Sequence, residues 1–282
     1  MNLIDRQVFS TTALRDNIPK NTFSPKRFGM VGKVVIAGGG PGDEGLLTLK
    51  CIEVIGSADV IIYDRLIPKS ALRYARPGTE LIYAGKEPGK HAMEEDEIIR
   101  IMIREASNGR LVLRLHGGDA FLFGRGFEEC IAVLSVGIPC EVIPGVTSAI
   151  AAPETYLIPP VLRGISSSVA IVTGMEDPRK GRAFVNFREL AKAVNTIIIL
   201  MGASRINEIA RELIEGGIDP GTYVAIITRA YMEDSKVMIT TVSKLTTGQI
   251  NVENPSVIVV GDVVREGLKA MKKAGINFES NT

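Results

Sequence analysis

Short runs of aliphatic residues alternate along this chain with segments in which apolar residues recur every three or four positions. The first pattern predicts buried strands and the second predicts amphipathic helices. Regular alternation of the two predicts parallel strands joined by helices. In the first half we expect strands at 33–37, 59–64, 80–85, 110–115 and 139–145. Helices are expected between them at 46–58, 69–75, 94–109 and 126–137.

A proline-rich passage, 153–164, separates this half from a second alternating half. Strands are expected there at 167–175, 195–202, 222–230, 236–245 and 255–261, and helices at 189–194, 204–217 and 262–275. Because segment 236–245 alternates apolar and polar residues, it predicts an exposed antiparallel strand and hence a mixed sheet. The chain is therefore expected to be an α/β protein with two α/β domains, 31–145 and 146–282.

Residues 1–30 show neither period and mix polar, charged and proline residues. A flexible tail is the simplest expectation for such a terminus. An arm without a core of its own is ordered only against another surface, so our alternative hypothesis is that it packs across a partner subunit. A third possibility is that Met30 is the usual start and the arm is dispensable.

Composition narrows the class of protein. The 33 basic and 32 acidic residues nearly cancel, which argues against a nucleic-acid-coating surface but leaves room for a local basic site. No apolar run approaches the ~20 residues of a membrane span, and the N-terminus lacks the apolar core of a signal peptide. Three widely spaced cysteines and two histidines predict neither a metal site nor a disulfide scaffold, but reduced thiols in a cytoplasmic protein.

The stretch GGGPGDEG follows the first predicted strand and contains G-x-G-x-x-G, with Asp64 about 20 residues further on. This spacing is the dinucleotide fingerprint. However, Pro41 removes a backbone donor, and Asp43 and Glu44 place negative charge where a pyrophosphate would bind. The stretch therefore fits a phosphate-free ligand better, and an NAD-dependent oxidoreductase is the weaker alternative. A tight turn with Asp43 as helix N-cap is compatible with either reading.

Two further turns follow predicted strands, at the sheet edge where α/β proteins bind ligands. Asp64 ends the second strand beside Arg65, which is typical either of a solvated ion pair or of a general acid or base. Lys86 follows the third strand, and Lys90 and His91 lie close to it in sequence. The turn around Lys86 is either a solvated loop, a site for an anionic ligand, or the position of a proton donor.

The stretch LHGGDAFLFGRGFEE follows the fourth predicted strand. Gly117 and Gly118 allow close backbone approach, and Asp119 places a carboxylate at the sheet edge. Arg125 stands at a helix start, where the helix dipole disfavours a cation, so a ligand role is favoured over a stabilising one. His116, taken alone, is more typical of a structural histidine than of a catalyst.

The segments GGGPGDEGLLTLK, VIIYDRLI, YAGKEPGKHA, LRLHGGDAFLFGRGFEE, VIPGVTSAIAAP and VAIVTGMED occur in the order of the hallmark segments of the tetrapyrrole methylases. The chain resembles this family from residue 31 to about 267. The resemblance implies two α/β domains with the active site in the cleft between them, a homodimer, and S-adenosylmethionine as cofactor, with S-adenosylhomocysteine as its product.

Within that family the motifs are most similar to the branch that methylates uroporphyrinogen III twice, through precorrin-1, to precorrin-2. This step belongs to siroheme- and cobalamin-type tetrapyrrole synthesis. The alternative within the family is a methylase that acts on a later precorrin intermediate. In either case a sulfonium donor activates its own methyl group, so catalysis is mostly positioning and needs no metal.

Carried over by motif, the resemblance implies that Asp64 is the proton acceptor and Lys86 the proton donor. Its implied cofactor contacts are Pro41, Gly117, Gly118, Asp119, Leu122, Thr147, Ser148, Met201 and Ala230. A substrate with eight carboxylates calls for basic side chains around the cleft. The candidates are Arg65, Lys86, Lys90, Arg114, Arg125, Arg163 and Arg229.

Two departures from the family pattern concern charge and turn geometry. His116 and Ala120 stand where the family commonly has Lys and Pro, so a titratable group replaces a constant positive charge. Glu87 stands where the family commonly has Arg, which weakens the expected grip on substrate carboxylates near Lys86.

Overall fold

The computed structural model describes residues 31–85, 93–176 and 184–281. The predicted arm, 1–30, lies outside these ranges. So do Lys86, Glu87 and Lys90, whose predicted roles the structure therefore does not address.

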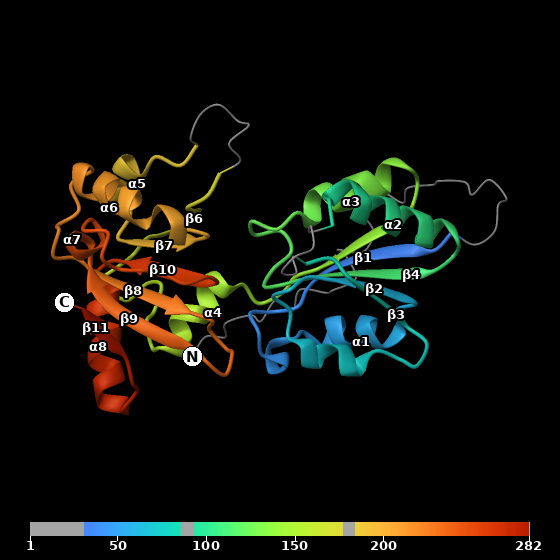
Figure 1. Cartoon of the computed structure of the whole chain (residues 1–282), viewed down its shortest axis with the longest axis horizontal. Helices are drawn as coiled ribbons and strands as arrows, with labels where there is room; N and C mark the ends of the chain where they lie inside the picture. The colour runs from blue at the N-terminus through green and yellow to red at the C-terminus, as the bar shows by residue number, and fades with distance from the viewer. Residues whose placement is uncertain (1–30, 86–92, 177–183, 282) are drawn as a thin grey trace, which may run out of the picture. The chain divides into compact units, whose positions relative to one another are not determined.

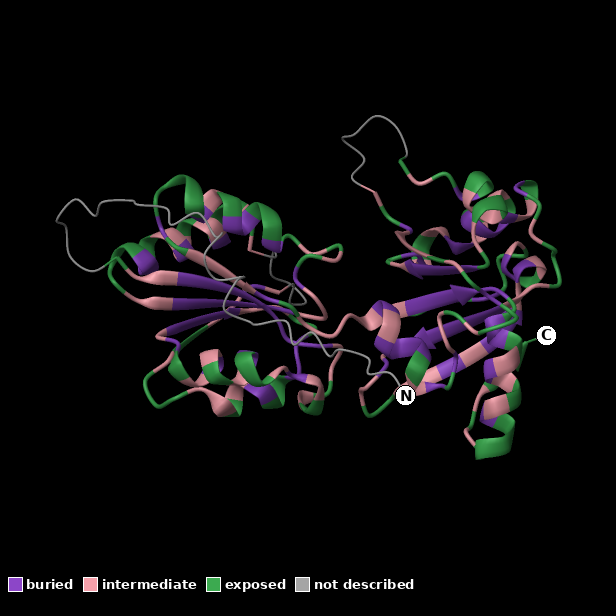
Figure 2. Cartoon of the chain, turned by 180° about the vertical axis from the view of Figure 1, so that it is seen from behind, coloured by how far each residue is buried: buried purple, intermediate pink, exposed green. Residues whose placement is uncertain are grey.

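The first sheet consists of five parallel strands in the order β3-β2-β4-β1-β5 (Figure 1), which confirms the predicted parallel arrangement. The strands are β1 (Lys33–Gly38), β2 (Val60–Tyr63), β3 (Glu80–Tyr83), β4 (Leu111–His116) and β5 (Cys140–Ile143). The central strands β1 and β4 are almost wholly buried (Figure 2), because helices cover both faces of the sheet. This explains their continuous apolar runs.

The helices of this half divide between the two faces according to which strand residues they cover. Helices α2 (Glu95–Ser107) and α3 (Gly126–Ser135) share a core with Val34 and Ile36. On the other face, α1 (Leu49–Ser57) packs with Val35 and Ala37. The predicted helix at 69–75 is instead a 3₁₀ helix, Lys69–Tyr74, whose bounding turns are closed by i→i+3 hydrogen bonds.

The second sheet has six strands in the order β11-β9-β8-β10-β7-β6 and is mixed, as predicted. Its strands are β6 (Val169–Thr173), β7 (Thr196–Leu200), β8 (Tyr223–Thr228), β9 (Lys236–Thr241), β10 (Ser256–Val260) and β11 (Glu279–Asn281). One face is covered by α4 (Ser148–Thr155) and α8 (Val263–Ala274). The other face is covered by α5 (Phe187–Ala193), α6 (Ile206–Glu215) and α7 (Val242–Leu245).

The prediction for 236–245 is only partly right. The strand β9 is antiparallel to β8, as expected, but it ends at Thr241 and the chain continues as α7. It is also not an exposed strand, because β11 pairs with its outer side and Val237 and Ile239 are buried. The boundary between two domains near Gly145 stays a prediction. None of the helices in the described ranges has the length and apolar character needed to cross a membrane.

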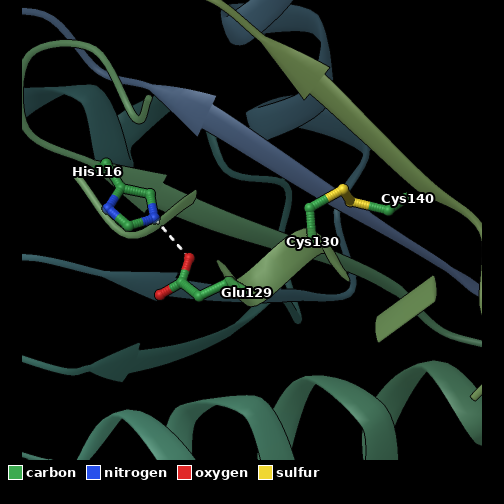
Figure 3. Close-up of a disulfide and its surroundings, with 4 residues drawn as sticks. All are labelled: His116, Glu129, Cys130 and Cys140. Atoms are coloured by element: carbon green, nitrogen blue, oxygen red, sulfur yellow. Dashed lines mark hydrogen bonds and ion pairs between the residues drawn. A yellow bond between two sulfur atoms is a disulfide. The ribbon is translucent and has the colours of Figure 1, made fainter. Parts of the chain in front are cut away.

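The expectation of reduced thiols is wrong for two of the three cysteines. Cys130 on α3 and Cys140 at the start of β5 form a disulfide (Figure 3). Their spacing of 10 residues gives no such signal, but the chain returns from α3 into β5 and brings the two Cα atoms to 5.8 Å. Cys51 is free, and burial raises the pKa of its thiol to about 11.

We expect reduction of this disulfide to lower the free energy of unfolding by ~2.5 kcal/mol, the chain-entropy value for a loop of this length. Urea unfolding of the protein with and without dithiothreitol measures the difference. Cys51→Ser serves as the control, because that thiol forms no crosslink and the variant should respond to reductant as the wild type does. Identical midpoints for oxidised and reduced protein would contradict the prediction.

Candidate active site

Three glycines bring the turns after β1, β4 and β5 into backbone contact. A Cβ atom at Gly145 would lie 2.3 Å from the carbonyl oxygen of Gly118 and 2.6 Å from the Cα of Gly38. Gly40 and Gly118 also exchange backbone hydrogen bonds of 3.1 and 2.7 Å. Gly38 and Gly145 leave no room for a Cβ atom, and Gly40 and Gly118 have positive φ angles of 76° and 67° that favour glycine. The GPGD turn and the GGD turn are therefore held against each other.

Asp119 stabilises the same junction through its carboxylate. Its Oδ1 accepts hydrogen bonds from the backbone N–H groups of Phe121 (2.9 Å) and Leu122 (3.0 Å), and its Oδ2 accepts one from Gly145 N–H (3.0 Å). Asp119 therefore ties its own turn to the turn after β5. Its predicted contact with a cofactor stays a prediction.

A cavity of about 110 Å³ opens beside this junction. Five of the nine predicted cofactor contacts line it, namely Pro41, Gly117, Gly118, Ser148 and Ala230. The remaining wall is formed by Leu66, Ile227, Arg229, Met232, Pro255, Ser256 and Val257. The cavity thus joins loops that the sequence analysis had connected only through the family resemblance.

Three other predicted cofactor contacts lie elsewhere. Leu122 packs against the core of the second sheet. The Thr147 hydroxyl caps α4 by accepting a hydrogen bond of 3.3 Å from the Ala149 N–H. Met201 follows β7 with a left-handed φ of 54° and an exposed side chain.

The lining residues that the sequence analysis missed come mainly from the ends of β8 and β10. These strands are antiparallel neighbours, so the carboxyl end of β8 meets the amino end of β10, and Ser256 pairs with Thr228. At β8 the sequence did offer a signal, because this apolar strand ends in the polar pair Thr228 and Arg229, which is typical of a ligand-binding strand end. The contribution of Pro255 and Ser256 had no signal, because ligand sites are not expected at the start of a strand.

Asp64 lies in a cluster of four charged residues that we call the ion-pair ring. Arg114 on β4 donates from Nη2 to Asp64 Oδ1 (2.7 Å) and from Nε to Glu129 Oε1 (2.9 Å). His116 Nε2 lies 2.6 Å from Glu129 Oε2, a contact seen in Figure 3. His116 Nδ1 lies 3.4 Å from Asp64 Oδ2 and closes the ring. Arg114, His116 and Glu129 are buried, whereas the Asp64 side chain is 30% exposed.

Burial opposes ionisation throughout the ring, but the mutual contacts outweigh it. The pKa values of the Asp64 and Glu129 carboxyls lie below their usual range because His116 and Arg114 donate to them. Burial would lower the pKa of His116, yet its contacts with Asp64 and Glu129 raise it above the usual value. With His116 protonated, the four groups are two cations and two carboxylates with no net charge, which is how buried charges are tolerated.

The basic candidates fall into different environments. Arg114 is buried within the ion-pair ring, so its proposed role in binding substrate carboxylates is wrong. Arg229 lines the cavity and pairs with Asp234 (2.6 Å) and Glu253 (2.9 Å). Arg125 is exposed and pairs with Glu95. Arg65 and Arg163 are exposed, and neither makes an ion pair within the described ranges.

Comparison with known proteins agrees with this geometry. A uroporphyrinogen-III C-methyltransferase from Bacillus subtilis (strain 168) is 44% identical, over 83% of this chain and 91% of the relative. An enzyme of the same name from Methanocaldococcus jannaschii is 42% identical, over 83% and 98%. The crystal structure of a Thermus thermophilus uroporphyrin-III C-methyl transferase complexed with S-adenyl homocysteine superposes with a TM-score of 0.72 at 36% identity, covering 83% of this chain and 94% of that one. The family model for tetrapyrrole (corrin/porphyrin) methylases matches residues 33–246, and the chain belongs to this family.

Proposed function

We propose that this protein is an S-adenosylmethionine-dependent C-methyltransferase that methylates uroporphyrinogen III twice, through precorrin-1, to precorrin-2. Its similarity to several uroporphyrinogen-III C-methyltransferases over most of their length supports the substrate. The cofactor is supported by the relative from Thermus thermophilus, which was crystallised with S-adenyl homocysteine.

The observation that carries this proposal is the cavity beside the glycine junction. Leu66 lines it and packs closely on Gly117, since a Cβ at Gly117 would lie 2.8 Å from the Leu66 Cβ. Asp64, two residues before Leu66, is thereby placed at the same sheet edge as the predicted cofactor turn. With Pro41 in place of a backbone donor, the lining suits a sulfonium ligand without phosphates.

The chain's own residues then have two tasks. The cofactor supplies an activated methyl group, and the protein positions a ring carbon of the substrate in line with it. The methylated ring system must afterwards lose a proton, which the Asp64 carboxylate accepts as general base. We keep Lys86 as the proposed proton donor, and Asp119, Leu122, Thr147 and Met201 as proposed cofactor contacts beside the five that line the cavity.

We further propose a homodimer that works in the cytoplasm. The family resemblance supports the homodimer. Sedimentation equilibrium of the full chain tests the assembly. A monomer at micromolar protein concentration would contradict the proposed homodimer.

The test of function has two stages. Differential scanning calorimetry should show a raised melting temperature with S-adenosylhomocysteine and none with NAD, because only a ligand of the folded state stabilises it. Transfer of labelled methyl from S-adenosylmethionine to uroporphyrinogen III should then give a product carrying two added methyl groups. Stabilisation by NAD alone would support an oxidoreductase, and methylation only of a later precorrin would change the substrate.

Arg65, Lys90, Arg125 and Arg163 are our proposed contacts for the substrate carboxylates. We expect Arg125→Ala to raise the KM for the tetrapyrrole several-fold, roughly the loss of one exposed charged contact, and to leave the affinity for S-adenosylhomocysteine within twofold. Steady-state kinetics and calorimetric titration measure the two effects. Arg125→Lys keeps the charge, so its KM for the tetrapyrrole should lie between those of the wild type and Arg125→Ala. A larger loss of affinity for S-adenosylhomocysteine than of affinity for the tetrapyrrole would instead make Arg125 a cofactor contact.

A further inference from the structure

Glu129 occupies an unusual position for a carboxylate that lies outside the cavity. Its side chain is only 2% exposed, and its two oxygens bind two different cations, Arg114 at 2.9 Å and His116 at 2.6 Å. It reaches them from α3, whose first turn follows the GGD turn. Removing it would leave two buried cations on β4 with one carboxylate between them.

The same two cations hold the proposed general base. Arg114 binds Asp64 Oδ1 at 2.7 Å, and His116 Nδ1 lies 3.4 Å from Oδ2, so both carboxylate oxygens are engaged from the protein side. The side chain nevertheless keeps 30% of its surface exposed. Asp64 is therefore anchored on one side and open on the other.

The protonation of His116 decides whether this anchoring is complete. As an imidazolium it donates from both ring nitrogens, one to Glu129 and one to Asp64. As a neutral ring it keeps one proton, and the 2.6 Å contact requires that proton at Nε2, between His116 and Glu129. The lone pair of Nδ1 then faces the Asp64 carboxylate. The four residues of the ion-pair ring then carry a net charge of −1.

We propose that Glu129 and His116 are positioning residues for Asp64: Glu129 anchors the two cations that hold the carboxylate, and the proton on His116 makes that hold depend on pH. This inference rests on the proposed function, because it assigns Asp64 a role in methyl transfer. The charged groups that face His116 in the described ranges are Asp64 after β2, Arg114 on β4 and Glu129 on α3. The elevated pKa of His116 agrees with a proton shared between two carboxylates.

The kinetic test compares His116→Lys with His116→Gln. Wild-type kcat should fall on the alkaline side as His116 loses its proton. His116→Lys keeps a cation and should move this fall to higher pH. His116→Gln should show no fall in kcat on the alkaline side. Its kcat should be roughly tenfold lower than that of the wild type at all pH values, with the KM for S-adenosylmethionine unchanged. If both variants follow the wild-type pH profile, the proposal is overturned.

A second test does not depend on activity. The chain has two histidines, His91 and His116, so His91→Gln leaves a single imidazole whose titration is read by NMR. In that background Asp64→Asn should lower the midpoint of His116, because one carboxylate partner is lost. Glu129→Asp, which keeps the charge but shortens the side chain, should lower it as well.

The two tests separate the possible failures. Absence of methyl transfer by the wild type would contradict the proposed function. The NMR titration tests only the coupling within the ion-pair ring. A His116 midpoint that neither Asp64→Asn nor Glu129→Asp changes would overturn the coupling, whatever the activity.

Discussion

Replacing Asp64 with asparagine should lower the rate of methyl transfer about 10³-fold, within the range typical of a lost general base. The amide cannot accept the proton that the methylated ring must lose. Its oxygen can still accept the hydrogen bond that Arg114 Nη2 donates at 2.7 Å, so we expect the variant to fold. Single-turnover transfer of labelled methyl to uroporphyrinogen III measures the effect.

Two measurements separate chemistry from structure in this variant. Calorimetric titration should find wild-type affinity for S-adenosylhomocysteine, since Asp64 does not line the cavity. The matched control is Asp262→Asn, the same change at an exposed aspartate that pairs with Arg265; it should keep full activity. A rate for Asp64→Asn within threefold of the wild type would remove Asp64 from the mechanism.

Gly145→Ala should lower the free energy of unfolding by about 3 kcal/mol. The added methyl would meet Gly118 O at 2.3 Å and Gly38 Cα at 2.6 Å. Both are backbone atoms, so the clash is relieved only if the turns after β1 and β4 separate. Because Gly118 lines the cavity, affinity for S-adenosylhomocysteine should fall with stability.

Urea unfolding and calorimetric titration check both effects. Gly56→Ala is the matched control, because a Cβ there meets only Tyr74 O, at 3.4 Å, and the position lies inside α1. That variant should be as stable as the wild type or up to ~1 kcal/mol more stable, with unchanged affinity. Equal stability of the two variants would mean that the glycine junction tolerates a side chain.

Most of the fold follows from local pattern. The buried runs at β1, β7 and β10 are strands because β-branched residues fit a sheet covered on both faces. Asp43 caps the 3₁₀ helix Glu44–Leu46, as its position before that turn predicted. The predictions that proved wrong concern features that depend on which distant segments pack together. Whether 236–245 is exposed depends on β11, which lies about 40 residues further along the chain.

The candidate site shows the same division. By itself the sequence determined that glycine turns follow β1 and β4, that Asp64 ends a strand, and that the motifs belong to the tetrapyrrole methylases. These features depend on residue type and order alone. It also indicated that a histidine stands where the family commonly has lysine, but not what that histidine touches.

Only the tertiary structure decided the partners of Asp64. The register that pairs Tyr63 with Leu115 brings Asp64 level with His116, and the packing of α3 on the sheet turns Glu129 towards both cations. The contacts join residues 13 to 52 positions apart in the chain, so they depend on sheet order and helix rotation, which no local pattern encodes. The Cys130–Cys140 disulfide and the contribution of Pro255, Ser256 and Val257 to the cavity were hidden for the same reason.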